Sequence, residues 1–184
     1  MKTKRHLLYW IGGWIFDFTK IITILTFVGL IINYFLYTIL IVKGESMKPN
    51  YWDGDVMVVD RVRYRAVKPE RGDVIALYFP GELERKFIKR IIGLPNEEIA
   101  IKDGNLYINQ VLIQESYLPP VITRPDMTLK LTPDEYFVMG DNRDVSSDSR
   151  MWGPLPSESI LGIVEYKVGN TNFWQSKVKQ VVFK

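Results

Sequence analysis

The pattern of apolar and polar positions divides the chain into two unlike parts. Residues 21–42 read IITILTFVGLIINYFLYTILIV, a run of 22 residues without a charged side chain. A helix of that length rises roughly 33 Å, which is enough to cross a hydrocarbon core of about 30 Å. A buried helix of a soluble core is the alternative, but such helices are seldom apolar on every face over their whole length. We therefore predict a transmembrane anchor over residues 21–42.

Beyond the anchor the apolar runs are short and rich in Val, Ile and Tyr, and all ten prolines lie after residue 48. Prolines at these intervals leave no room for long helices. Residues 98–108, EIAIKDGNLYI, alternate on both sides of Asp103-Gly104, which is typical of a hairpin with a primed turn. The other runs that read as strands are 55–62, 73–79, 86–94, 136–139 and 160–168.

Prolines 119, 120 and 125 interrupt the segment from about 114 to 133, and we expect an irregular excursion there. Together these patterns predict a mainly β protein. An antiparallel β-sheet domain over residues 43–184 would follow one N-terminal transmembrane helix.

The net charge of +3 lies entirely at the N-terminus. Residues 1–42 carry four basic residues against one aspartate, whereas residues 43–184 carry the remaining 20 basic and 20 acidic residues. The outer part therefore has no net attraction for a polyanion, and nucleic acid is not an expected partner. Because basic residues precede the span, we expect a single-pass plasma-membrane protein with a cytoplasmic N-terminus and an extracytoplasmic C-terminal domain.

Residues 7–18, LLYWIGGWIFDF, are too short to form a second span. Trp10 and Trp14 suggest that this segment lies in the cytoplasmic interface, so residues 1–20 are expected to be cytoplasmic or interfacial. A cleaved signal peptide is the competing interpretation of residues 1–42. It requires a shorter apolar core and a small-x-small cleavage site, which the sequence Ile41–Glu45 does not provide, so we expect an uncleaved anchor.

Two residue counts exclude whole classes of chemistry. The chain has no cysteine, and its one histidine is His6 in the basic tail. Thiol nucleophiles, disulfides, cysteine zinc sites, Ser-His-Asp triads and multi-histidine metal sites are thereby excluded. Hydrolytic chemistry would have to use Ser, Thr, Lys, Tyr, Asp or Glu.

Two polar stretches stand out early in the outer part. The first, Gly44–Pro49, contains a serine that taken alone reads as a loop residue. The second contains Lys89 and Arg90, which are adjacent on a predicted strand and so point to opposite faces. One of them should face inward, where a charge is costly unless it is paired or neutralised. On periodicity alone, however, an edge strand with two solvated charges is preferred.

The third polar stretch, Gly140–Arg150, holds three aspartates, three serines and two arginines in eleven residues. A calcium loop is one interpretation, but the acids at 141, 144 and 148 do not have the alternate-residue spacing of an EF-hand. The arginines would also repel a cation. Asp–Arg pairing within a rigid loop is the better physical interpretation.

In this order and behind one anchor, these stretches resemble the sequence boxes of bacterial type I signal peptidases. The resemblance covers residues 43 to about 168, and the short excursion resembles the Gram-positive form. The matching boxes are Ser46–Pro49 (SMxP), Gly72–Val74 (GDV), Lys89–Pro95 (KRIIGLP) and Gly140–Arg150 (GDNRxxSxDSR). The resemblance implies a signal-peptidase-like β fold and a membrane-bound serine endopeptidase that needs neither a metal nor an organic cofactor. Its substrates would be signal peptides of exported preproteins, cut after small residues at the first and third positions before the cut.

The resemblance also implies residue roles. Ser46 would be the nucleophile of an acyl-enzyme mechanism and Lys89 its general base, with Ser146 hydrogen-bonded to Lys89 and orienting it. Arg90, Asp141, Asp148 and Arg150 resemble the family's structural ion pairs. The Ser46 N–H would meet the oxyanion, with a second donor expected near Gly44.

A lysine acts as a base only when it is neutral. Lowering its pKa from about 10.4 to about 7 costs roughly 4–5 kcal/mol, which burial would have to supply. The apolar residues that flank Lys89 in the sequence, Phe87, Ile88, Ile91 and Ile92, are suited to this.

The sequence departs from the family pattern at three places. Gly44 stands where some relatives have a serine that serves as a second oxyanion donor, so a backbone group or a water would have to act there. Asn50 replaces a frequent threonine, and Asn96-Glu97 replaces the usual Gly-Asp.

Two other functions have to be distinguished from this one. Self-cleaving SOS repressors share the Ser–Lys chemistry, but they carry a DNA-binding domain in place of the anchor. A non-catalytic β module that binds exported partners is the second, and the presence of Ser46, Lys89 and Ser146 favours the enzyme instead. The expected partners are signal peptides and the lipid bilayer, and we expect a monomer.

Overall fold

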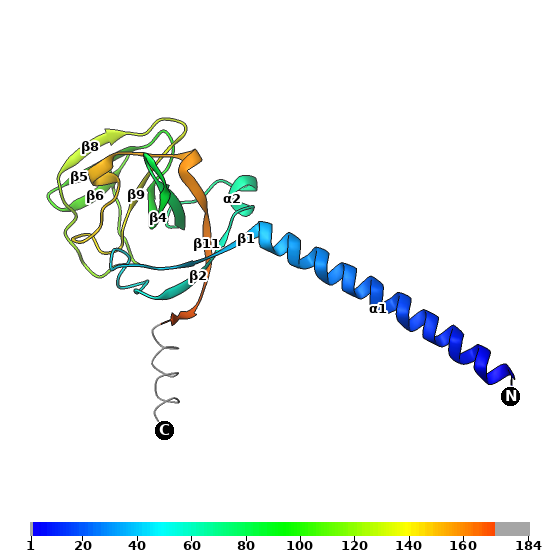
Figure 1. The fold of residues 1–184 in the computed structure, drawn as a ribbon. Coiled ribbons are helices and arrows are strands. Elements are labelled where there is room, and N and C mark those ends of the chain that lie inside the picture. Colours follow the sequence, from blue (N-terminus) through cyan, green and yellow to red (C-terminus); the bar gives the residue numbers. More distant parts are fainter. Residues whose placement is uncertain (1, 172–184) are drawn as a thin grey trace, which may run out of the picture. The chain divides into compact units, whose positions relative to one another are not determined.

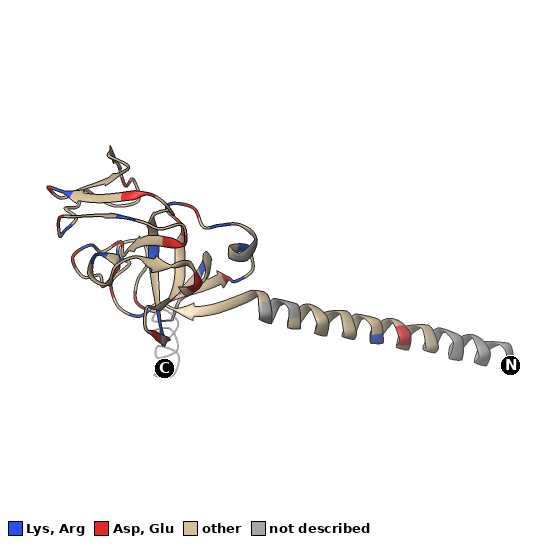
Figure 2. Cartoon of the chain, turned by 90° about the horizontal axis from the view of Figure 1, so that it is seen from above, with Lys and Arg blue, Asp and Glu red and all other residues tan. Residues whose placement is uncertain are grey.

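The computed structural model describes residues 2–171 and divides near residue 37 into a helical unit and a β domain (Figure 1). Helix α1 (Lys2–Leu36) is continuous. Its stretch from Gly13 to Ile31 has a mean hydropathy of 1.8 and is long and apolar enough to cross a membrane. The described part of α1 has few charged residues, whereas charged residues of both signs are spread over the β domain (Figure 2).

The predicted end of the anchor at Val42 is wrong. The helix ends at Leu36, and the next residues form strand β1 (Tyr37–Ile41) beside β2 (Asp55–Asp60). The Val42 N–H donates to the Asp55 carbonyl, and the Val42 carbonyl accepts from the Gly54 N–H. The reason is physical: an apolar run with β-branched residues satisfies its backbone equally well as a helix in lipid or as a strand on a sheet.

The apolar stretch that is long enough to cross a membrane, Gly13–Ile31, begins before the predicted anchor. It overlaps the segment 7–18 that we expected to lie in the interface, and α1 has no break there within the described residues. The side chain of Trp10 lies outside the described part of the chain, while Trp14 is exposed.

The β domain consists of two sheets. In the larger sheet, neighbouring strands pair antiparallel from β2 across the sheet to β10, and all neighbouring strands of the smaller sheet are antiparallel as well. The seven-stranded sheet has the order β1-β2-β11-β3-β4-β9-β10, where the strands not yet given are β11 (Ile160–Asn170), β3 (Val74–Phe79), β4 (Glu82–Gly93), β9 (Glu135–Met139) and β10 (Leu155–Pro156). The four-stranded sheet has the order β7-β6-β5-β8, formed by β7 (Val111–Leu112), β6 (Asn105–Ile108), β5 (Glu98–Lys102) and β8 (Met127–Lys130). The mainly antiparallel β fold behind one apolar helix is as predicted.

Helices in the β domain are short, as the proline spacing predicted. They are α2 (Arg63–Ala66), α3 (Ser149–Trp152) and the 3₁₀ turn η1 (Ser157–Ser159). The hairpin prediction is confirmed, because Lys102 pairs with Asn105 and both intervening residues, Asp103 and Gly104, have positive φ. The excursion prediction needs a correction, since β8 lies inside it and pairs with β5. Its half-exposed sequence MTLK has little apolar signal, and its pairing is made through the backbone.

Apolar clusters form the core, and the two larger ones both include residues of β4 and β9. One lies within the larger sheet and the other joins β4 and β9 to the hairpin. Buried members of the first are Ile75, Leu77, Ile91, Tyr136, Val138, Leu155, Ile160 and Ile163. Those of the second are Ile92, Ile99, Ile101, Leu106, Ile108, Leu131, Phe137 and Met139.

Strand β4 lies between β3 and β9, in the interior of the larger sheet. The edge strand that periodicity favoured for Lys89 and Arg90 is therefore wrong. Both side chains are buried, and each has a polar partner, because a central strand has protein on both faces. This placement fixes the surroundings of the polar residues described next.

Candidate active site

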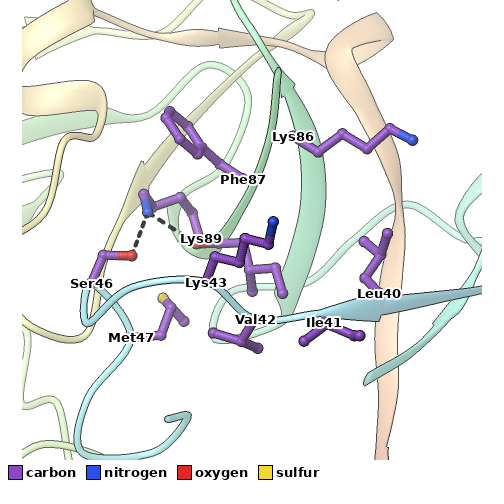
Figure 3. A pocket seen from close by; sticks show the side chains of 10 residues that line it. Leu40, Ile41, Val42, Lys43, Ser46, Met47, Lys86, Phe87 and Lys89 are labelled. Carbon is purple, nitrogen blue, oxygen red and sulfur yellow. Dashed lines mark hydrogen bonds between the residues drawn. The ribbon is translucent and has the colours of Figure 1, made fainter. Parts of the chain in front are cut away.

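Ser46 meets Lys89, which lies in the second half of β4. Ser46 lies in the turn that follows β1, and the Lys89 Nζ makes hydrogen bonds to the Ser46 Oγ at 2.9 Å and to the Ile88 carbonyl at 3.1 Å (Figure 3). The two residues are 43 positions apart in the sequence. The contact thus depends on how β1 and β4 are placed in the sheet.

Burial makes Lys89 an unusual lysine. Its exposed fraction is 2%, Met47 beside it is 1% exposed, and the Phe87 ring centroid lies 5.0 Å from its Nζ. Desolvation lowers its pKa to about 8, which is opposed by the negative charges of Asp148 and Asp141 and assisted by Arg150. A sizeable neutral fraction at mildly alkaline pH lets this amine accept a proton.

Ser146 lies beside the nucleophile without the predicted hydrogen bond to Lys89. Its Oγ is buried and has no hydrogen-bond partner among the described residues. A Cβ atom added to Gly140 would lie 2.2 Å from that Oγ and 2.4 Å from the Ser46 carbonyl oxygen, so the three residues are packed closely and only glycine fits. The Lys89 amine is instead directed to Ser46 and to its own strand.

The oxyanion region differs from the expectation at Gly44. The Gly44 N–H donates to the Asp53 carboxylate at 2.8 Å, so this backbone group is already engaged. The Ser46 N–H, by contrast, makes no hydrogen bond to any residue that the structure describes. It is free to donate to an oxygen that arrives next to the Ser46 Oγ.

The four charged residues named from the sequence form two buried ion pairs. Arg90 binds Asp141 through two hydrogen bonds, at 2.8 and 2.6 Å, and also donates to the Gly72 carbonyl. Arg150 binds Asp148 through two bonds of 2.8 Å. Asp148 and Arg150 form the pairing within the loop that was preferred over a calcium loop, whereas Asp141 pairs outside the loop, with Arg90 on β4.

Sequence reasoning missed several residues that hold the site. The Asn142 N–H donates to the Ser46 carbonyl and its side-chain amide donates to the Glu45 carbonyl. The Asn50 amide donates to Asp141 at 2.7 Å and to the Tyr117 carbonyl. No local sequence pattern indicates the backbone hydrogen bond of Asn142 or the contacts of Asn50. The only signal at Asn50 was that it replaces a threonine that is frequent in the family.

A third buried ion pair was also missed. Arg143 binds Glu115 through two hydrogen bonds and donates to Thr123 as well. Arg143 belongs to the box that was recognised, but Glu115 lies in the excursion, where no pattern indicated a partner. This pair fastens the excursion to the loop that follows β9.

A cavity of about 130 Å³ opens beside Ser46 and Lys89 (Figure 3). Two backbone segments border it, Leu40–Lys43 after the start of β1 and Lys86–Lys89 on β4, together with Ser46 and Met47. Sequence reasoning left the substrate pockets unassigned, because a pocket between segments this far apart leaves no local pattern.

Comparison with known proteins shows the family of the chain. The profile of the family described as signal peptidase, peptidase S26, matches residues 15–168. The chain belongs to the signal peptidase family. It is 30% identical over 189 residues to signal peptidase IB of Staphylococcus aureus, covering 93% of this chain and 91% of that protein. It is 33% identical over 162 residues to signal peptidase I P of Bacillus subtilis subsp. natto, covering 82% and 87%.

Two further matches cover less of this chain. The chain is 36% identical over 126 residues to probable signal peptidase I-2 of Synechocystis sp., which covers 66% of this chain and 58% of that protein. A crystal structure of a signal peptidase I from Enterococcus faecalis V583 matches with a TM-score of 0.49 and 34% identity, over 54% of this chain and 98% of that one.

Proposed function

We propose that this chain is a signal peptidase I: a membrane-anchored serine endopeptidase that removes signal peptides by a Ser46–Lys89 dyad. The observation that carries the proposal is the hydrogen bond between a serine in a turn and a lysine buried deeply enough for its pKa to fall to about 8. A buried amine beside a hydroxyl is the arrangement that serine activation without histidine requires.

In the proposed reaction, neutral Lys89 takes the proton of the Ser46 hydroxyl while the Oγ attacks the scissile carbonyl carbon. The oxygen of the tetrahedral intermediate accepts a hydrogen bond from the Ser46 N–H. The Lys89 ammonium then gives its proton to the departing amine, which leaves an ester on Ser46. Lys89 next takes a proton from a water that attacks this ester, and returns it to the Ser46 Oγ as the carboxylate product departs.

The cavity supports small side chains next to the cut. Its volume of about 130 Å³ is small, and its lining combines the apolar residues Leu40, Val42 and Met47 with polar ones that include Ser46 and Lys89. An extended peptide bordered by two backbone segments can pair with them as an added strand. Alternate side chains of such a strand enter the cavity, so we infer small residues at the first and third positions before the cut.

The apolar stretch Gly13–Ile31 supports a single-pass anchor. We propose a cytoplasmic N-terminus and an extracytoplasmic β domain, because Lys2, Lys4 and Arg5 lie before the apolar stretch. That orientation places the dyad on the side where exported precursors emerge. We also propose that the chain acts as a monomer, since the dyad and cavity are complete within one chain.

The deciding experiment measures cleavage of a preprotein by the full chain in detergent. Ser46→Ala and Lys89→Ala should each abolish cleavage, and the double variant should be little worse than either single variant, because the two residues act as one unit. Lys89→Arg should also be inactive, since a guanidinium does not lose its proton. Lys102→Ala, at an exposed position on β5, is the matched control.

The alternative of a non-catalytic module makes a different prediction. A module of that kind would bind the preprotein without cleaving it, and Ser46→Ala would change nothing. Appreciable turnover by Lys89→Arg would contradict the assignment of Lys89 as the base.

A further inference from the structure

Two lysines line the cavity beside the dyad without a carboxylate partner among the described residues. Lys43 and Lys86 both line it and are both exposed. Neither side chain forms an ion pair within the described part of the chain. Figure 3 shows Lys43 extending from the segment after β1 toward β4, whereas Lys86 extends away from Ser46, with its Nζ 5.7 Å from the centre of the Tyr78 ring.

The carboxylates that are nearest to Lys43 in the sequence have other partners. Glu45 forms an ion pair with Lys48, with an N–O distance of 2.6 Å. Asp53 accepts the hydrogen bond of the Gly44 N–H at 2.8 Å. The ammonium of Lys43 is therefore available to a charge that enters with the substrate.

The geometry of an extended substrate determines which side chain meets Lys43. If the first and third side chains before the cut enter the cavity, the second points to the opposite, outer side, because side chains alternate along an extended chain. Lys43 lies three residues before Ser46 and is exposed at the mouth of the cavity. A side chain at the second position is thus the one that passes within reach of a flexible lysine.

We propose that Lys43 is a specificity-determining residue that favours an acidic side chain at the second position before the cut. This inference rests on the proposed peptidase function and on the substrate direction along the cavity. A glutamate there would be attracted and a lysine repelled, each by about threefold in kcat/KM as expected for an exposed charge pair, which gives about tenfold between the two. The preference should weaken as salt is added, because exposed charges are screened.

The experiment uses the full chain in a zwitterionic detergent and three peptides that differ only in Glu, Gln or Lys at the second position. The wild-type enzyme should rank them Glu, Gln, Lys in kcat/KM. Lys43→Gln should bring the three values together, Lys43→Glu should invert the order, and Lys43→Arg should keep it. Lys102→Gln removes the same charge from β5 and should leave the ranking unchanged.

The Gln peptide distinguishes a failure of the proposed peptidase function from a failure of the proposed role of Lys43. If it is not cleaved by the wild-type enzyme, the peptidase function itself fails. If it is cleaved but Glu and Lys peptides are cleaved equally, or if Lys43→Glu keeps the original ranking, the role of Lys43 is overturned. A defect of Lys43→Gln that appears only with vesicles of anionic lipid would likewise overturn it and assign the cation to the membrane surface.

Discussion

At the scale of single residues, the proposed activity depends on the protonation state of the Lys89 amine. Because only the neutral amine can accept the Ser46 proton, kcat/KM should rise with pH and reach half of its plateau near the pKa of about 8. The check is a pH–rate profile of the full chain on an uncharged peptide. An acidic limb near 10, as for a solvated lysine, would show that burial does not set the reactivity of this residue.

The same burial should cost stability. A lysine whose pKa falls from 10.5 when unfolded to about 8 in the fold loses its proton earlier in the native state. The unfolded chain then binds more protons between these two values, so stability is lowest below pH 8 and rises as the pH approaches 10.5. The corresponding cost at neutral pH is about 3 kcal/mol.

Lys89→Met should therefore give an inactive protein that is more stable than the wild type at pH 7. The gain should be at most about 3 kcal/mol and should shrink toward pH 10.5. Urea unfolding at pH 7 and pH 10 measures it, with Lys102→Met as the exposed control. Equal stability of Lys89→Met and the wild type at pH 7 would mean that the buried amine is better solvated than its surroundings suggest.

At the scale of elements, the turn that carries Ser46 is fastened to the loop after β9. Asn142 donates to the carbonyls of Ser46 and Glu45, and Asn50 donates to Asp141. Asp141 in turn holds Arg90, the neighbour of Lys89 on β4. The distance between nucleophile and base is thus set by contacts between three separate segments of the chain.

Asp141→Asn tests this fastening. Loss of the carboxylate leaves the Arg90 guanidinium buried without a counter-ion, which should destabilise the fold by about 3–5 kcal/mol. The remaining activity should have its acidic limb at lower pH, because the Asp141 charge raises the pKa of Lys89. Asp144→Asn, which changes an exposed carboxylate in the same loop, is the control. Unchanged unfolding and an unchanged pH profile for Asp141→Asn would rule out the role of this ion pair.

At the scale of the whole molecule, the end of α1 changes how the dyad is related to the membrane. From an anchor that ended at Val42, the chain would hold Ser46 within roughly 13–14 Å of the bilayer. Since α1 ends at Leu36, Ser46 is the tenth residue beyond it, and ten residues reach roughly 33–36 Å when extended. Chain length alone therefore does not keep the site at the bilayer.

An exposed apolar face of the seven-stranded sheet is a second feature that would hold the site close to the bilayer. Leu40 packs with the buried Val59, so Ile39 and Ile41 on β1 point to the opposite side and are 69% and 52% exposed. Tyr166 on β11 pairs with Val58 and is exposed on that same side. Exposed aromatic and aliphatic side chains on one face are suited to the lipid headgroup region.

A spacer measures whether proximity matters. Ten Gly/Ser residues inserted between Leu36 and Tyr37 leave β1 intact and add a separation of roughly 16–19 Å by coil statistics. We expect slower processing of membrane-bound precursors and unchanged cleavage of a soluble peptide. Native rates on both substrates would show that the site works independently of its distance from the bilayer.

Local chemistry explains which parts of the fold were predictable. The hairpin of β5 and β6 follows from Asp103-Gly104 and the alternation around it, because turn preference and register act within a few residues. The strands β2, β3, β4, β9 and β11 follow from short apolar runs between turn residues. Strand β8 and the two-residue strands do not, since their stability comes from backbone pairing with a distant partner rather than from their own side chains.

By itself, the sequence determined that one apolar helix precedes a β domain and that any serine chemistry here must do without histidine. The resemblance of its sequence motifs to those of type I signal peptidases pointed to Ser46 and Lys89 as the reacting pair. The tertiary structure alone decided where the helix ends, since the run 37–42 suits lipid and sheet equally. It also decided the central position of β4 and the contacts of Asn50 and Glu115, because strand order and long-range pairing depend on segments that are far apart in the chain.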